Sequence, residues 1–305
     1  MWKGKSNASL AAGLVIAIAL WGGNNVGTKW LVGSWPPIFT GGTRFFCAGL
    51  LLLAVLRGTN WLGDYVPPTR ELNRALWWRG GLSLAAYIVV FNYALRFTSA
   101  SHVALYLGAA PVWALWWEAG SERVPVGWGR WSAALLALSG VAVLLGPALA
   151  GSNVNLPGEV LGLAASVLWT NYGRQSRKLA ATLNGAEVSA HTMWRAGLLL
   201  LPLALLELAQ TDVPMNAPRL GVQAYCVIAG GVIAFALWNR ALGQWPASRV
   251  LLFNNLIPVS TMAWAHFCLG EMVTRTFLLA LLLIAAGVGL GQMAANGADR
   301  TPPAE

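Results

Sequence analysis

Apolar residues run through the chain in long stretches, separated by short charged or Pro/Gly-rich breaks. About 20 helical residues cross the hydrocarbon core of a bilayer, and ten stretches have about that length. They are roughly Ser9–Val32, Pro36–Leu56, Trp77–Arg96, Ser101–Ala119, Trp128–Ala148, Leu156–Ser176, Glu187–Glu207, Gly221–Leu242, Trp245–Phe267 and Thr274–Ala294. The pattern predicts an all-α integral membrane protein with ten transmembrane helices, short connections and no soluble domain.

Composition supports the same fold class. Hydrophobic residues make up 57% of the 305 residues and charged residues 10%, against roughly 25% charged residues in soluble proteins. This is too little charge for a water-soluble surface, and it excludes disordered, collagenous and disulfide-stapled proteins. Cys47, Cys226 and Cys268 lie in apolar stretches without CxxC spacing. We interpret them as small buried residues and expect no metal site.

The basic residues predict the orientation of the chain. With the N-terminus in the cytoplasm, 14 of the 20 Lys and Arg residues fall on the cytoplasmic side, four fall on the opposite side, and two lie inside spans. This asymmetry predicts a multi-pass protein of the cytoplasmic (inner) membrane with both termini in the cytoplasm. The net charge of +9 then reflects topology and anionic lipid headgroups, and we expect no nucleic acid partner.

The sequence also contains an internal repeat. Residues 100–105 (ASHVAL) recur 147 positions later as residues 247–252 (ASRVLL), and Pro111 and Pro258 follow them at the same spacing. Five matches in one order at nearly one offset indicate a duplication. The other four, at offsets of 147 or 148, pair AGLLLL at 48–53 with 196–201, Asn92-x-Ala94-Leu95 with Asn239-x-Ala241-Leu242, Gly140-Val141 with Gly287-Val288, and Leu20-Trp21 with Leu168-Trp169.

The repeat divides the chain into two units, residues 9–148 and 156–294, with five predicted spans each. Because five is odd, the second unit must enter the membrane from the opposite side. The two units are therefore expected to be inverted, related by a pseudo-two-fold axis in the membrane plane. Inverted repeats are typical of alternating-access transporters, in which the substrate site lies near the midplane between the halves.

Several motifs carry a resemblance to a known family. They are RFFxAGL at 44–50, Ala94-Leu95, the repeated Ala-Ser-x-Val-x-Leu…Pro segment and Gly270-Glu271. With these motifs the chain resembles the EamA domain of the drug/metabolite transporter (DMT) superfamily over about residues 9–292. Ser121-Glu122 stands where the family usually has Gly-Glu, which is a departure. The resemblance implies ten helices, two inverted repeats, cytoplasmic termini and, often, export of amino acids or other small metabolites.

We therefore expect a secondary transporter of small metabolites, an exporter of amino acids or related compounds that works by alternating access. The alternatives are a sugar or sugar-phosphate exchanger of the same superfamily and a small-solute channel. The chain has no Asp cluster for a diphosphate, no HExxH, no GxSxG and no phosphate-binding loop, so we expect neither an enzyme nor a cofactor. A proton or another coupling ion stays open, as do a monomer and a homodimer.

Two prolines predict kinks in the fourth and ninth spans. Pro111 and Pro258 each lie about halfway along a span, where a proline removes an intrahelical hydrogen bond. Irregular backbone at this depth lies beside protein or a water-filled cavity. We expect both kinks to face a central substrate cavity, with Tyr106 beside the first and Asn254 and Asn255 beside the second. The alternative is a packing kink in which the amide groups satisfy the freed backbone.

Polar and aromatic side chains form stripes along the first and sixth spans. Trp21, Asn24, Asn25 and Thr28 are spaced i, i+3, i+4 and i+7, so they share one face of a helix. Polar groups in hydrocarbon face partners or a cavity, and we expect this face to bind substrate. The alternative is hydrogen bonding between helices without ligand contact. The other aromatic residues of the predicted lining are Tyr87, Trp169 and Tyr172.

Arg44 and Arg195 lie inside the second and seventh spans, each nine residues from the start. This places them about 12 Å into the membrane, where an unpaired arginine costs at least about 3 kcal/mol. Both are candidates for substrate binding, and we expect one of them, Arg44 ahead of Arg195, to face the cavity and to attract a carboxylate or another anionic group of the substrate. The alternative is that backbone carbonyls at a helix end bind each guanidinium.

The acidic residues give no candidate for proton coupling inside the predicted spans. All eleven Asp and Glu residues fall in connections, tails or the ends of spans, so we expect no carboxylate proton relay at the midplane. We interpret His102, His191 and His266 as structural residues, with proton coupling as the alternative.

Overall fold

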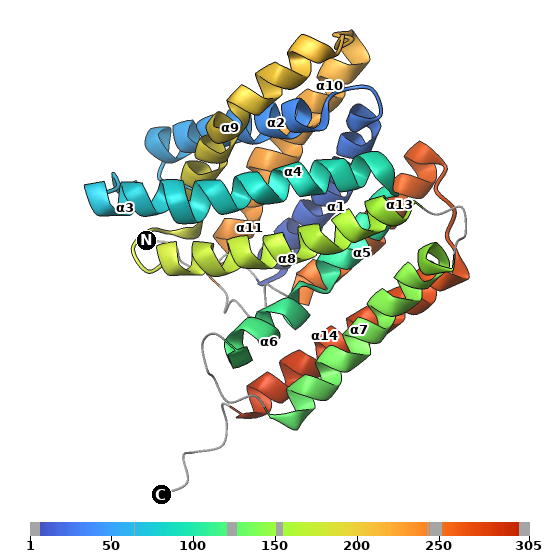
Figure 1. Cartoon of the computed structure of the whole chain (residues 1–305). Helices are drawn as coiled ribbons and strands as arrows, with labels where there is room; N and C mark the ends of the chain where they lie inside the picture. Colours follow the sequence, from blue (N-terminus) through green and yellow to red (C-terminus); the bar gives the residue numbers. More distant parts are fainter. Residues whose placement is uncertain are drawn as a thin grey trace, which may run out of the picture.

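The computed structural model describes residues 7–63, 65–120, 127–150, 155–242, 244 and 252–298. Within these ranges the regular structure is helical (Figure 1). The first half forms α1 (Asn7–Val32), α2 (Pro37–Gly58), α3 (Arg70–Ala75), η1 (Leu76–Gly81), α4 (Leu82–Phe97), α5 (Ala100–Gly108), α6 (Ala110–Gly120) and α7 (Trp128–Leu149). The second half forms α8 (Leu156–Leu179), α9 (Gly185–Gln210), α10 (Ala217–Tyr225), η2 (Cys226–Ile233), α11 (Ala234–Leu242), η3 (Leu252–Leu256), α13 (Ile257–Leu269) and α14 (Arg275–Ala298).

These elements make ten helical stretches in the described ranges, in the predicted order. The elements α3, η1 and α4 are continuous, as are α10, η2 and α11, and η3 runs directly into α13; α5 and α6 are separated by Ala109 alone and count as one stretch. The structure therefore confirms a helical membrane fold. Six stretches are long and apolar enough to span a membrane, and α13 and α14 add shorter apolar helices. Charged residues lower the hydropathy of α8, and a break between α5 and α6 leaves each of them short.

Three predicted boundaries need comment. The third stretch begins at Arg70 rather than near Trp77, because the hydroxyl of Thr69 caps the helix by accepting from the Leu72 N–H at 3.3 Å. The ninth predicted span began at Trp245, but residues 245–251 lie outside the described ranges. The Ser121-Glu122 pair lies outside them as well.

The helices pack in pairs that relate the two halves of the chain. Counting the stretches in chain order, the second packs on the seventh (α2 on α9) and the fifth on the tenth (α7 on α14, side by side in Figure 1). The third packs on the sixth (α4 on α8), and the first packs on the eighth (α1 on α10, η2 and α11). The first also packs on the ninth (α13), as the sixth does on the fourth (α5 and α6). Exchanging the halves maps this set of contacts onto itself.

Glycines permit close crossings at equivalent points. On α2 and α9, a Cβ on Gly49 would collide with the backbone of Trp194, and one on Gly197 would lie 2.5 Å from Cβ of Phe46. The crossing of α7 and α14 likewise has a glycine on each helix where a Cβ would meet a backbone carbonyl oxygen of the other, at 2.8 and 2.6 Å. Both crossings therefore bring backbones into direct contact.

The third and eighth stretches each contain a π-helical segment, η1 and η2, with a pair of adjacent glycines. Gly80 of η1 lies against Thr192 of α9, and a Cβ on Gly230 of η2 would lie 2.6 Å from Oδ1 of Asn24 on α1. A π-helical segment inserts an extra residue per turn and changes the face that a helix presents. Each segment packs against helices of the other half, η1 against α8 and α9 and η2 against α1 and α2.

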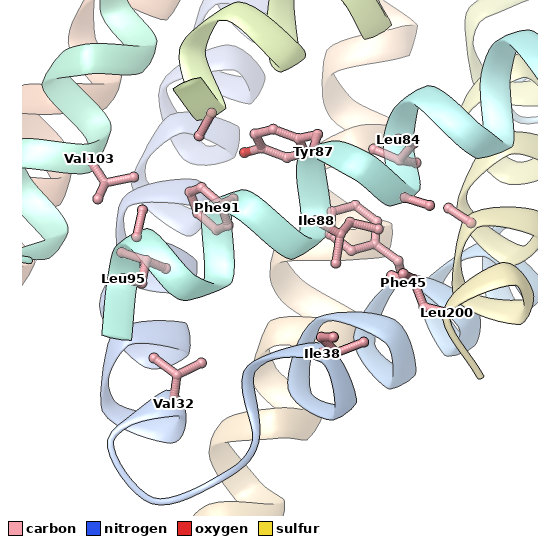
Figure 2. Packing of buried hydrophobic residues seen from close by; sticks show 14 of the residues in the cluster. Val32, Ile38, Phe45, Leu84, Tyr87, Ile88, Phe91, Leu95, Val103 and Leu200 are labelled. Atoms are coloured by element: carbon pink, nitrogen blue, oxygen red, sulfur yellow. The ribbon is translucent and has the colours of Figure 1, made fainter. Parts of the chain in front are cut away.

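The largest cluster of buried apolar side chains surrounds α4 (Figure 2). In this view side chains from α1, α2, α5 and α9 converge on the central helix. Its labelled members are Val32, Ile38, Phe45, Leu84, Tyr87, Ile88, Phe91, Leu95, Val103 and Leu200.

Candidate functional site

Arg44 is a buried cation in the third turn of α2. The side chain is 4% exposed, and its Nη1 donates to Thr28 Oγ1 at 2.7 Å and, more weakly, to Asn24 Oδ1 at 3.4 Å. The guanidinium carbon lies 4.4 Å from the ring centroid of Phe45 and 5.9 Å from that of Phe91. These groups are neutral, so in the described part of the chain the charge has no carboxylate partner. An anion can therefore gain an ion pair here.

The polar stripe of α1 meets three other parts of the bundle. Thr28 and Asn24 bond Arg44 of α2 as described, and Asn25 Nδ2 donates to Thr261 Oγ1 of α13 at 3.1 Å. Nε1 of Trp21 donates to the carbonyl of Gly230 in η2 at 3.0 Å. The stripe therefore contacts the second, eighth and ninth helical stretches.

Aromatic rings continue from Arg44 to the sixth helix. Tyr87 of α4 is 5% exposed, and its ring lies 5.2 Å from that of Phe91 and 5.0 Å from that of Trp169 on α8. Trp169 lies 5.5 Å from Tyr172, whose hydroxyl pairs with Thr192 Oγ1 of α9 at 2.8 Å. Tyr87 and Phe91 occupy successive turns of α4 (Figure 2).

We define the Arg44 cluster as Asn24, Thr28, Arg44, Tyr87 and Phe91. Cys226 of η2 borders it, with Sγ 3.9 Å from Thr28 Oγ1 and 3.8 Å from the Asn24 carbonyl oxygen. Cys226 is buried as predicted, but the prediction was wrong for Cys47 and Cys268, which are exposed on the outer faces of their helices. Sequence reasoning missed Phe91 and Cys226, because an apolar residue gives no sign of facing a cation. In the described ranges no three His, Cys, Asp or Glu side chains gather to bind a metal ion.

The structure does not bring Arg195 into this cluster. Arg195 is 3% exposed; its Nη1 donates to the carbonyl of His191 at 3.0 Å, and its Nη2 donates to Asn73 of α3. Its guanidinium carbon lies 4.2 Å from the ring of Trp194 and 5.5 Å from that of Trp77. The neighbours of Arg195 thus come from α9, α3 and η1.

The residues near the two prolines take different positions. The helix of the fourth stretch is interrupted at Ala109, two residues before Pro111, while Pro258 lies in the first turn of α13 after the 3₁₀ segment η3. Asn254 in η3 is half-buried, and the side chain of Asn255 lies outside the described part of the structure.

Tyr106 is fully buried and donates to Glu159 of α8 at 2.6 Å. It therefore belongs to a different polar cluster from Arg44. Glu159 was not a candidate from the sequence, because it stands in the first turn of a span. The sequence feature that could have indicated it is His102, which lies in the first turn of α5 at the same end of the bundle.

A small pocket opens at the start of α1. It has a volume of about 100 Å³ and is lined by Ser9, Leu10, Gly13, Leu237 and Arg240. Trp21, two turns further along α1, packs at 5.2 Å against the rings of both Phe235 and Trp238 on α11. The interface of α1 and α11 therefore leads from the pocket toward the polar stripe.

Comparison with known proteins adds a family. A model of the "EamA-like transporter family" matches residues 9–146 and 156–290. A probable amino-acid metabolite efflux pump of Salmonella typhimurium is 27% identical over 161 residues, 50% of this chain and 54% of that protein; the chain thus aligns with about half of its length. A probable terminal-alkyne amino-acid exporter of Streptantibioticus cattleyicolor is 26% identical over 212 residues, 69% of this chain and 70% of that protein.

Relatives that align over more of the chain have less specific names. The uncharacterized transporter YwfM of Bacillus subtilis is 26% identical over 286 residues, 90% of each chain. A crystal structure with 21% identity superposes with a TM-score of 0.64 over 96% of this chain and 100% of the other. At this identity the likeness shows the fold.

Proposed function

The chain belongs to the EamA-like transporter family and is a membrane transporter of small metabolites, and we propose that it exports amino acids or related compounds across the cytoplasmic membrane by alternating access. Two observations support this cargo. Two relatives are named as amino-acid exporters or efflux pumps, and a buried arginine faces neutral hydrogen-bond partners at the helix crossings.

We further propose that residues 9–148 and 156–294 form two inverted repeats with both termini in the cytoplasm. The packing set that maps onto itself when the halves are exchanged supports this arrangement, as does the excess of basic residues on one side. Alternating access then consists of one half moving against the other about the α2–α9 and α7–α14 crossings.

The observation that carries the binding proposal is the unpaired guanidinium of Arg44. A carboxylate placed against it forms a charge-assisted pair, with Asn24 and Thr28 as neighbouring hydrogen-bonding groups. The rings of Tyr87, Phe91 and Trp169 provide an apolar wall for the rest of the cargo. Trp21 and Asn25 extend the polar face, and Tyr172 closes the opposite end.

We assign different roles to the remaining candidates. Arg195 joins α9 to α3 and η1, since its Nη1 donates to the carbonyl of His191 and its Nη2 donates to Asn73. Asn254 and Asn255, beside the second kink, keep the predicted role of lining the route, as Pro111 and Pro258 keep that of shaping it. Sugar phosphates are the competing cargo, because their phosphate would also pair with Arg44.

The experiment is a transport panel with the purified full-length chain in liposomes. Labelled amino acids and sugar phosphates are tested one by one for exchange against the same unlabelled compound inside. We expect saturable exchange of one or more amino acids. Exchange of sugar phosphates alone would replace the cargo, and a flux that does not saturate would replace the carrier by a channel.

A further inference from the structure

A second buried ionisable group lies where α4 ends and α5 and α8 begin. Glu159, in the first turn of α8, is 0% exposed. Its carboxylate accepts hydrogen bonds from the hydroxyl of Tyr106 at 2.6 Å and from that of Thr98. Its two oxygens lie 3.0 and 3.1 Å from Nδ1 of His102. We name Thr98, His102, Tyr106 and Glu159 the Glu159 cluster.

The cluster joins the fourth helical stretch to the sixth. A Cβ on Gly158 would lie 2.7 Å from the carbonyl carbon of Phe97, and one on Gly162 would lie 2.7 Å from Cδ2 of Tyr106. Glycines on both sides of Glu159 thus let α8 touch the end of α4 and the start of α5. The carboxylate lies in the seam between these helices, and three groups from the other side of the seam bond to it.

Charged groups of other helices surround this end without reaching the carboxylate. Lys29 of α1 and Arg96 of α4 donate to backbone carbonyls at 2.7 and 2.6 Å. Glu271, which follows α13, accepts from the first backbone N–H of α5 at 2.8 Å. In the described part of the chain the ion-pair partner of Glu159 is therefore the imidazole of His102.

An ionised carboxylate accepts all of these hydrogen bonds, whereas a neutral carboxyl group is a weaker acceptor and carries a proton that it must donate. Protonation therefore weakens the contact between α5 and α8. We propose that Glu159 is the proton-binding residue of a gate: ionised, it holds the fourth and sixth helical stretches together, and protonated, it lets them separate. Only the consequence for cargo release rests on the proposed function.

His102 provides the path for the proton. Its side chain is 22% exposed while Glu159 is fully buried, so the imidazole connects the carboxylate to solvent. The distribution of basic residues predicts that this end faces the outside of the cell. The gate then responds to external pH, and acid outside favours the open form.

The test measures opening without any cargo. Ser166 is fully buried on the same face of α8, two turns beyond Glu159, and bonds Trp113 of α6. A Ser166→Cys probe is placed in the full chain after replacing the exposed Cys47 and Cys268 by Ser, and its reaction with a membrane-impermeant thiol reagent is timed.

At constant pH, Glu159→Gln imitates the protonated carboxyl. We expect it to raise the labelling rate of the probe by about tenfold or more, since losing a charge-assisted hydrogen bond shifts an equilibrium by about this factor. The matched control is Glu207→Gln. Glu207 accepts from the Phe39 N–H at 2.8 Å and the Tyr93 hydroxyl at 3.0 Å at the same end of the bundle, so these hydrogen bonds join α9 to α2 and α4. This control should leave the rate unchanged.

Protonation itself is tested by lowering the pH from about 7 to about 3, a range that includes the titration of both free and hydrogen-bonded carboxyl groups. The probe rate is divided by the rate of Met272→Cys, an exposed position, to remove the pH dependence of thiol chemistry. We expect this ratio to rise about tenfold in the parent and to stay flat in Glu159→Gln.

A labelling rate unchanged by Glu159→Gln, or a pH response that survives it, would overturn the proposal. If Glu159→Gln does not yield folded protein, Tyr106→Phe decides, because it removes one hydrogen bond and should raise the rate several-fold; no rise would again overturn the gate. Because no transport is measured, failure here leaves the cargo proposal untouched, and failure of the transport panel leaves the gate untouched.

Discussion

An equivalent contact between two helices appears once in each half of the molecule, charged in the first half and neutral in the second. In the first half, Asn24 of α1 meets Arg44 of α2. The positions 148 residues later are Tyr172 of α8 and Thr192 of α9, whose hydroxyl oxygens lie 2.8 Å apart. The duplication has kept the position of the contact, while one copy carries a buried charge and the other is neutral. If cargo binds between the two contacts, we expect its anionic group to lie on the side of Arg44.

One glycine of each π-helical segment packs against a residue of these contacts. Gly230 of η2 presses on Asn24, and Gly80 of η1 presses on Thr192. Arg195, in contrast, is offset from Arg44 by 151 positions, which turns it toward α3 and η1. Two buried arginines therefore face different neighbours, which is why we propose different roles for them.

The largest expected effect comes from removing the charge on one side of the comparison. Arg44→Gln should lower the transport kcat/KM of amino acids by about 100-fold, as expected for loss of a buried charge pair. Initial rates of exchange in liposomes measure it, after equal expression and monodispersity are confirmed. Unchanged transport would show that the two copies of the contact are functionally alike.

A smaller effect should follow from moving Asn24 without changing any polar group. Gly230→Ala would place a methyl group 2.6 Å from Asn24 Oδ1 and should lower kcat/KM by about tenfold, since overpacking of this kind costs about 1–3 kcal/mol. The matched control is Gly221→Ala in the same helical stretch, where a Cβ meets nothing within 4 Å. Equal effects of the two changes would argue against a role for Asn24.

On the neutral side, Tyr172→Phe removes one hydroxyl and its hydrogen bond to Thr192. We expect KM to rise about three- to tenfold with kcat nearly unchanged, because a neutral hydrogen bond contributes about 1 kcal/mol. Saturation curves for exchange measure the split. A loss as large as that of Arg44→Gln would mean that the charge is not what distinguishes the halves.

Arg195→Gln should have the smallest effect on transport, within about twofold, and a larger one on stability. The change removes hydrogen bonds from a buried guanidinium to Asn73 and His191, which costs about 1–3 kcal/mol. Thermal unfolding in detergent measures the stability. Strong loss of transport in a variant of normal stability would return Arg195 to the binding site.

The helix order, the repeat and the shared face of the α1 stripe could be predicted from sequence, since each depends on periodicity or spacing along one chain. The position of Arg44 in the third turn of α2 followed from the same counting. Its neighbours Phe91 and Cys226 did not, because they depend on how α4 and η2 cross α2. In the sequence, only pairs of adjacent glycines mark the π-helical segments. The burial of Glu159 could not be predicted, because a position in the first turn of a span does not show which helices cover it.

The central claim is that Arg44 recognises the carboxylate of the cargo. The most direct test compares the exchange of the amino acid identified by the transport panel with that of its carboxamide, in the parent, in Arg44→Gln and in Arg195→Gln. We predict that the parent and Arg195→Gln prefer the acid by about 100-fold and that this preference falls to within a few-fold in Arg44→Gln. A preference that persists in Arg44→Gln would contradict the account.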